Sequence, residues 1–114
     1  MSSRRIDNAL HLSPLELRIL NALLIGQMTG YEVASQCLKD GETEAISHGT
    51  LYPALKRLAA ILLIEEAASL SLLVGPGKPR KAYRITSFGR ETLGWQLQAW
   101  QRLIDQARDR THRR

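Results

Sequence analysis

The sequence contains a single cysteine and no apolar stretch long enough to cross a membrane. With only Cys37, no disulfide can form within the chain, which is typical of proteins from a reducing compartment. A membrane-spanning helix needs roughly 18 or more apolar residues, and a secretory leader has a shorter apolar core; neither pattern occurs. We therefore expect a cytoplasmic protein in which Cys37, placed within an apolar helical pattern, is a small buried side chain.

The motifs of common catalytic and metal sites are also missing. The three histidines, His11, His48 and His112, lie far apart in the sequence. There is no His-Glu-x-x-His, no cysteine pair and no glycine-rich phosphate-binding loop. These absences argue against an enzyme, and we expect neither a cofactor nor a metal ion.

Charge is abundant and unevenly placed. The net charge of +5 favours an anionic partner. Residues 7–46 hold six acidic and two basic residues, whereas residues 47–84 hold six basic and two acidic residues. The positive charge is therefore concentrated in the later part of a chain of one-domain length. With 44% hydrophobic residues, the chain can bury a small core, whose stability would gain from dimerisation.

The most informative segment covers residues 47–58. Leu51, Leu55 and Leu58 recur at spacings of four and three residues, which places them on one face of a helix. Tyr52 lies at the edge of the opposite face. That face carries the polar, cationic and proline side chains Thr50, Pro53, Lys56 and Arg57. A short helix that is apolar on one side and cationic on the other suits a polyanion, so we interpret it as a DNA recognition helix.

Pro53 bears on where this helix begins. If Ser47 caps the helix, Pro53 is its sixth residue and one backbone hydrogen bond is lost, at a cost of up to ~3 kcal/mol. The first-turn N–H groups have no partner within the helix, so a later start removes that cost. We therefore expect the regular helix to begin at Gly49 or Thr50.

The segments on either side complete a winged helix-turn-helix. Residues 1–12 predict a loose arm, Ser13-Pro14 with Glu16 predicts a capped helix, and Thr29 predicts a second helix over residues 30–39. Residues 63–67 and 80–86 predict two antiparallel strands, joined by a hairpin loop rich in glycine and proline. The basic residues of this wing are Lys78, Arg80 and Lys81.

The last helix is predicted from Thr86 or Ser87 to about Arg110. Leu93, Leu97, Trp100, Ile104 and Ala107 are spaced four, three, four and three residues apart, which forms an apolar seam. The alternative to a partner helix is that the seam packs wholly against its own domain. We expect the same helix of a second subunit to cover it. The fold class is mainly α with a small β-hairpin: an arm (1–12), a winged helix-turn-helix domain (13–86) and a dimerisation helix with a basic tail (87–114).

Four segments in order resemble the PadR family of bacterial transcriptional regulators, in its compact subgroup with one C-terminal helix. The segments are Gly30–Val33, Gly49–Leu58, Gly77–Thr86 and Gly89. The resemblance implies a winged-helix homodimer that binds an inverted-repeat operator in double-stranded DNA, usually as a repressor. The DNA-facing residues that it implies are Tyr31, Thr50, Tyr52 and Lys56 in the helix-turn-helix and Lys78, Arg80 and Lys81 in the wing. Arg57 is a further candidate from the charge pattern.

Some PadR relatives bind flat aromatic ligands at the centre of the dimer, which implies a small planar aromatic effector stacked on Trp100, with Trp95 in the core or at the rim.

Two segments depart from the family's pattern. Residues 59–62 (Ala-Ala-Ile-Leu) stand where an acidic residue and a glycine are usual, and Leu70–Val74 makes the wing apolar. The alternative function is a winged-helix interaction module in which Leu70–Val74 docks a protein and DNA binding is lost.

Overall fold

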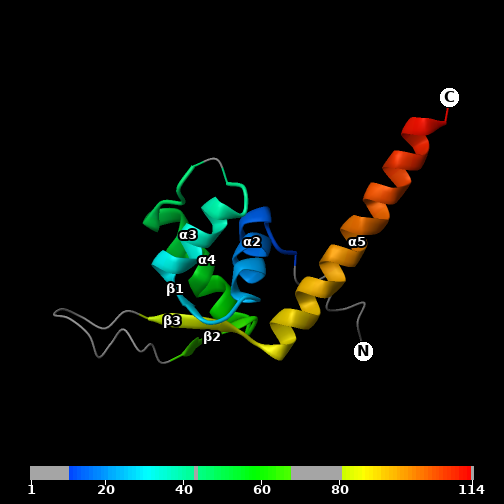
Figure 1. Ribbon diagram of the computed structural model, residues 1–114. Coiled ribbons are helices and arrows are strands. Elements are labelled where there is room, and N and C mark those ends of the chain that lie inside the picture. The colour runs from blue at the N-terminus through cyan, green and yellow to red at the C-terminus, as the bar shows by residue number, and fades with distance from the viewer. Residues whose placement is uncertain (1–10, 43, 68–80, 114) are drawn as a thin grey trace.

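The computed structural model describes residues 11–42, 44–67 and 81–113, and within them the chain forms four helices and a three-stranded antiparallel sheet. The elements follow in the order α2 (Pro14–Leu23), β1 (Met28–Thr29), α3 (Gly30–Lys39), α4 (His48–Ala60), β2 (Ile64–Ala67), β3 (Ala82–Ile85) and α5 (Ser87–His112). Figure 1 shows α2, α3 and α4 gathered beside the sheet, while α5 leads away from them. The expected class, mainly α with a small hairpin, is confirmed.

Reciprocal caps define the starts of α2 and α3. The Ser13 hydroxyl accepts the N–H of Glu16, and the Glu16 carboxylate accepts the N–H of Ser13. Thr29 and Glu32 make the same pair of bonds at α3. Each capping box satisfies two N–H groups that the helix leaves without partners. The sequence predicted the first box, whereas for α3 it indicated only the threonine cap.

Helix α4 begins earlier than we expected. Its N-cap is Ser47 and its first residue is His48, so Pro53 lies inside the helix. The carbonyl of Ser47 accepts N–H groups from both Thr50 and Leu51, so the first turn is hydrogen-bonded before the proline is reached. The expected start at Gly49 or Thr50 was wrong because this first turn forms despite the bond that Pro53 cannot make.

The sheet has the order β1-β3-β2. Met28 and Thr29 pair with Tyr83 and Ala82, and β2 pairs with the whole of β3 from Ile64↔Ile85 to Ala67↔Ala82. The two-residue strand β1 was not predicted. It connects α2 to α3, so its pairing with β3 attaches the helix-turn-helix to the base of the wing.

The core lies between the three short helices and the sheet. It contains the predicted leucines of α4, and Cys37 is buried there as expected. The other fully buried large side chains come from α2, α3 and the start of β2: Ile19, Leu20, Leu23, Val33, Leu63 and Ile64. The apolar face of α4 is therefore held against the domain, and its polar face points outward.

Close contacts fix the junction between the domain and α5. Gly89 lies so near the chain that an added Cβ would be 2.1 Å from the Leu63 carbonyl oxygen. Thr86 caps α5, and its hydroxyl also donates to the carbonyls of Leu62 and Leu63. Only a residue without a side chain permits this approach, so the direction of α5 is set where the helix begins.

Beyond its first two turns, α5 leaves the domain. Its buried residues are Gly89, Thr92 and Leu93, and every described residue from Leu97 onward is exposed. At about 1.5 Å per residue, its 26 residues extend roughly 39 Å. No helix within the described residues is both long and apolar enough to span a membrane.

Candidate nucleic-acid interface

The outward face of α4 presents the side chains that the sequence placed there. Leu51, Leu55 and Leu58 are buried, whereas Thr50 and Lys56 are exposed. Among the described residues no carboxylate pairs with Lys56. The ammonium group and the threonine hydroxyl can therefore both reach a ligand that lies along the helix.

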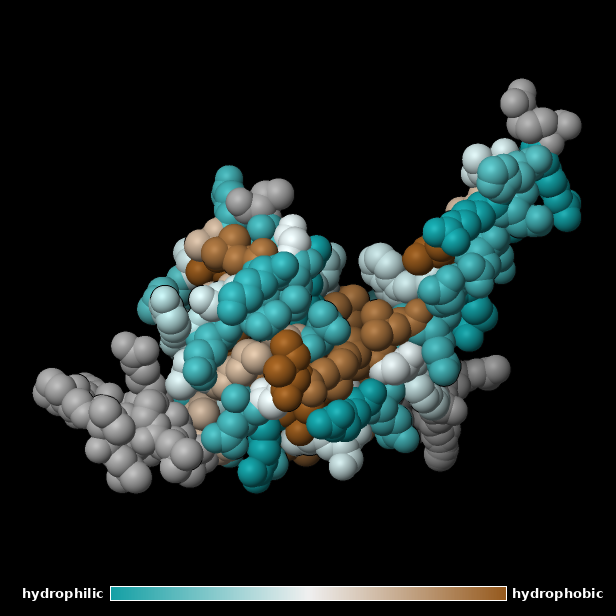
Figure 2. Space-filling model, viewed as in Figure 1, coloured by the Kyte–Doolittle hydropathy of each residue, from teal (hydrophilic) through white to brown (hydrophobic). Residues whose placement is uncertain are grey.

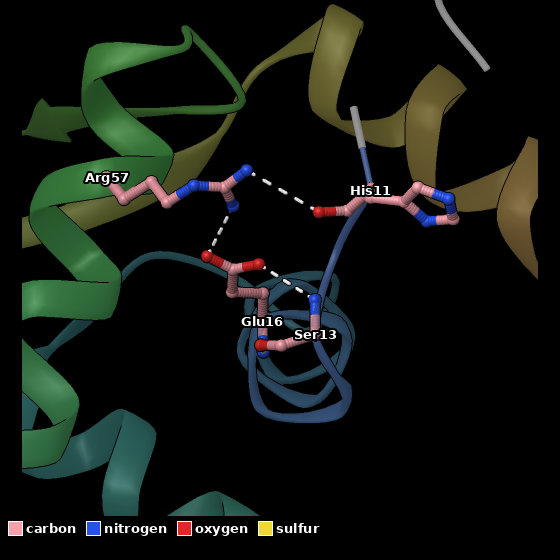
Figure 3. Close-up of polar contacts among 4 residues, drawn as sticks. All are labelled: His11, Ser13, Glu16 and Arg57. Atoms are coloured by element: carbon pink, nitrogen blue, oxygen red, sulfur yellow. Dashed lines mark hydrogen bonds and ion pairs between the residues drawn. The ribbon is translucent and has the colours of Figure 1, made fainter. Parts of the chain in front are cut away.

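Arg57 behaves differently from Lys56. Its guanidinium donates to the buried carboxylate of Glu16 at the start of α2, and it lies 3.5 Å from the carbonyl oxygen of His11 (Figure 3). The structure thus engages Arg57 within the domain, and we do not place it with the outward cations. Sequence reasoning missed Glu16 as its partner, because the capping box explained that residue locally.

Three residues predicted to face DNA come together in one hollow. Tyr31 of α3, Tyr52 of α4 and Lys81 just before β3 line a cavity of about 500 Å³. Thr29, Gly30, His48 and Tyr83 complete its lining. Phenol hydroxyls and an ammonium group beside one another can donate hydrogen bonds to an anion such as a phosphate.

Glycine and histidine position Tyr52 within this hollow. A Cβ on Gly30 would lie 2.6 Å from the Tyr52 hydroxyl oxygen, so the phenol rests against the bare backbone of α3. The ring of His48 lies 5.3 Å from that of Tyr52 at a tilt of 42°. Neither Gly30 nor His48 was a predicted site residue. The Gly30–Val33 segment is part of the family resemblance, but nothing in its spacing predicted the contact with Tyr52.

Ion pairs cross the base of the wing. Arg84 binds Glu65 on the paired strand at 2.6 Å, and Lys81 lies 3.4 Å from Glu66. Both pairs are exposed, so they contribute little to stability and leave the cations accessible. Lys78, Arg80 and the apolar segment Leu70–Val74, also singled out in the sequence, lie outside the described residues.

Two buried groups have altered acidities. Burial raises the pKa of the Tyr83 phenol, and the carboxylate of Glu66 adds to this effect while Lys81 opposes it. Burial also raises the pKa of the Cys37 thiol, with further increases from Asp40 and Glu42. Both groups are therefore neutral at physiological pH, so Tyr83 presents a hydroxyl to the hollow. No three His, Cys, Asp or Glu side chains of the described residues could hold a metal ion.

The residues of the predicted seam of α5 differ in burial. Leu93 is buried in the core of its own domain, whereas Leu97, Trp100 and Ile104 are 49%, 51% and 40% exposed. Ala107 is also exposed and Trp95 is half-buried. Leu103, which does not belong to the predicted seam, is also exposed. Figure 2 shows hydrophobic side chains continuing from the compact part of the molecule onto α5, so this helix carries an uncovered apolar surface.

The comparisons with known proteins agree on one family. The model of the transcriptional regulator PadR-like family matches residues 19–94. A transcriptional regulator from Clostridium thermocellum has a TM-score of 0.67 and 25% identity, with 99% of both chains covered. A PadR-like transcriptional regulator from Bacillus cereus has a TM-score of 0.71 and 29% identity, over 98% of this chain and 100% of that one.

A third structure is Bacillus subtilis PadR in complex with operator DNA. It has a TM-score of 0.63 and 27% identity, over 75% of this chain and 47% of that one. The search of curated protein sequences returns no match.

Proposed function

The chain belongs to the transcriptional regulator PadR-like family, and we propose that this regulator is a repressor that binds an inverted-repeat operator as a homodimer. The family's members regulate transcription, so the protein is not an enzyme. The observation that carries the proposal is the convergence of Tyr31, Tyr52 and Lys81 in one hollow beside the exposed face of α4. The complex of Bacillus subtilis PadR with operator DNA supports the choice of ligand.

Each part of this surface has its own task on a duplex. Tyr31, Tyr52 and Lys81 donate to phosphate oxygens, which fixes position and supplies salt-dependent affinity. Thr50 and Lys56 lie on the exposed face of α4, where they meet base edges in the major groove. Lys78 and Arg80, which lie outside the described residues, are proposed as further DNA-contacting cations.

Dimerisation through α5 supports the inverted repeat. Exposure of its apolar residues Leu97, Trp100 and Ile104 to water is unfavourable in free energy. A second copy that packs against them would cover them. A two-fold axis then presents two copies of α4 to half-sites about one DNA turn, roughly 34 Å, apart. A planar aromatic effector that stacks on Trp100 near this axis, with Trp95 at the rim, would release the operator by changing the spacing of the recognition helices.

The test is a gel-shift titration with DNA from upstream of the protein's own gene, using Lys56→Glu. This variant should bind at least about tenfold more weakly, because a cation at the groove becomes an anion. Lys39→Glu is the matched control, since Lys39 is exposed at the end of α3, outside the hollow. Equal affinity of the wild type for unrelated DNA at moderate salt, or full binding by Lys56→Glu, would overturn the proposal. Absence of any DNA binding by the wild type would also overturn it and would favour an interaction module instead.

A further inference from the structure

A second hollow lies between α3 and α4, and it shares three aromatic residues with the first. Its volume is about 310 Å³, and Tyr31, His48 and Tyr52 line both hollows. In Figure 2 a separate group of hydrophobic side chains is exposed near the loop that joins α3 to α4. We name this second hollow the α3–α4 groove.

The lining of the α3–α4 groove is chemically unlike that of the first hollow. Apart from the three aromatic rings, it consists of alkyl groups and one hydroxyl: Ala34, Ser35, Leu38, Ala45, Ile46 and Leu51. Among the residues that the structure describes, no carboxylate, ammonium or guanidinium group lines the groove, whereas Lys81 lines the first hollow. Leu38 is 42% exposed here, so a hydrophobic side chain of the groove meets water in the free protein.

We propose that the α3–α4 groove binds a small, uncharged aromatic molecule of one or two rings. Binding pockets for small molecules begin at about 300 Å³, which matches a ligand of this size. The rings of Tyr31, His48 and Tyr52 offer aromatic faces and edges for stacking. A charged ligand would lose its hydration in the groove without gaining a counter-ion, so the groove selects neutral molecules.

Binding in the groove alters the surface that faces DNA. Tyr31 and Tyr52 form the wall between the two hollows, so a ligand on one side restricts the rings that serve the other. The groove is therefore a second effector site, separate from Trp100 on α5. This regulatory step rests on the proposed function, whereas binding of the aromatic molecule does not.

The tyrosine content of the chain provides a direct experiment. The chain has three tyrosines, Tyr31, Tyr52 and Tyr83, and only the first two line the groove. With 3-fluorotyrosine incorporated and 2-naphthol as the probe, fluorine NMR should show saturable shifts for Tyr31 and Tyr52 and none for Tyr83. Both tryptophans lie on α5, so their fluorescence should not report this binding event.

Two variants and one control locate the probe. Leu38→Glu places a carboxylate in the groove and should weaken 2-naphthol binding by about tenfold or more. Ala45→Leu, at an exposed loop position, should weaken it by filling space without touching the core. Leu24→Glu is the control, because Leu24 is 39% exposed at the end of α2 and outside the groove. Binding that survives both groove variants, or that shifts Tyr83 as much as Tyr31, would overturn the proposal.

The regulatory step has a separate readout. Saturating 2-naphthol should lower the affinity for operator DNA in the wild type but not in Ala45→Leu. If the protein binds no DNA but the fluorine shifts of Tyr31 and Tyr52 remain, the proposed function is wrong and the proposal that the groove binds an aromatic molecule is supported. If DNA binds and no saturable tyrosine shift occurs, the groove proposal fails alone.

Discussion

Arg57 of α4 donates a hydrogen bond of 2.5 Å to the Glu16 carboxylate, which also accepts the N–H of Ser13 at the start of α2. The Glu16 side chain is 8% exposed and that of Arg57 is 44% exposed. One buried carboxylate therefore joins the first turn of α2 to α4. Two adjacent cations of the same helix therefore differ: Arg57 is paired with Glu16 within the domain, and Lys56 is exposed.

Arg57→Ala should lower the free energy of unfolding. It leaves the buried Glu16 carboxylate with the Ser13 N–H as its one remaining partner among the described residues, which costs about 1–3 kcal/mol. Urea denaturation at neutral pH measures the loss. Lys56→Ala is the matched control, because that exposed side chain has no ion-pair partner among the described residues; it should change stability by less than about 0.5 kcal/mol. Equal stability of the two variants would show that the pair does not fix α4.

Leu62 occupies a position that glycine usually takes. Helix α4 ends with N–H bonds from Leu62 to Ala59 and from Leu63 to Leu58, and Leu62 has a φ of 68°. Helix α3 ends with the same pattern, but there Gly41 has the positive φ. An L-residue pays about 1–2 kcal/mol for this conformation, and Leu62 is 68% exposed, so it regains little by packing.

Leu62→Gly should therefore stabilise the protein. Relief of the strained backbone outweighs the greater chain entropy of glycine when unfolded, and we expect a net gain of about 0.5–1 kcal/mol. Gly41→Ala is the reciprocal change and should lower the free energy of unfolding by a similar amount. Thermal unfolding of the two variants beside the wild type gives the answer, and a lower melting temperature for Leu62→Gly would contradict it.

Much of the fold could be predicted because local patterns determine it. The spacing of Leu51, Leu55 and Leu58 predicted the buried face of α4, and the glycine- and proline-rich loop predicted the hairpin. β1 could not be predicted, since two residues carry no periodicity and Met28 and Thr29 form a strand only by pairing with β3. Residues 59–62 depart from the family's pattern, but only the positive φ of Leu62 shows the physical consequence of that departure.

The candidate site was predictable as a set of residues but not as an arrangement. The family resemblance implied Tyr31, Tyr52 and Lys81, and the structure brings them into one hollow. Local spacing could not separate Arg57 from Lys56, because Glu16 lies 41 positions away from Arg57 in the sequence. Contacts of that range depend on how α2 packs against α4.

Stability should fall in alkaline solution. The folded state raises the pKa of Cys37 and of Tyr83, so it binds both protons more tightly than the unfolded state does. The corresponding stabilisation is complete below the ordinary thiol pKa of about 8.5 and is lost as the pH rises through the raised values. Urea unfolding at a series of pH values above neutrality measures the decline.

The Tyr83→Phe variant distinguishes the contribution of the Tyr83 phenol to this alkaline loss of stability from that of the Cys37 thiol. It should make the alkaline decline shallower, by up to about 1.4 kcal/mol for each pH unit in which only the unfolded phenol ionises. If the free energy of unfolding of Tyr83→Phe falls as steeply with rising pH as that of the wild type, the phenol does not contribute to the decline.

Trp100→Glu should separate the subunits without unfolding the domain. Trp100 lies on the exposed part of α5 and outside the core, so the melting temperature of the isolated subunit does not depend on it. At a two-fold contact, however, the change buries a carboxylate in each subunit, which should weaken association by about tenfold or more and operator binding with it. Arg102→Glu, half a turn away on the opposite face of the same helix, should leave both association and operator binding unchanged.

Sedimentation velocity across micromolar concentrations distinguishes the outcomes. A wild-type protein that is monomeric there, or a Trp100→Glu dimer as tight as the wild type, would mean that α5 does not join the subunits and that each recognition helix meets DNA alone.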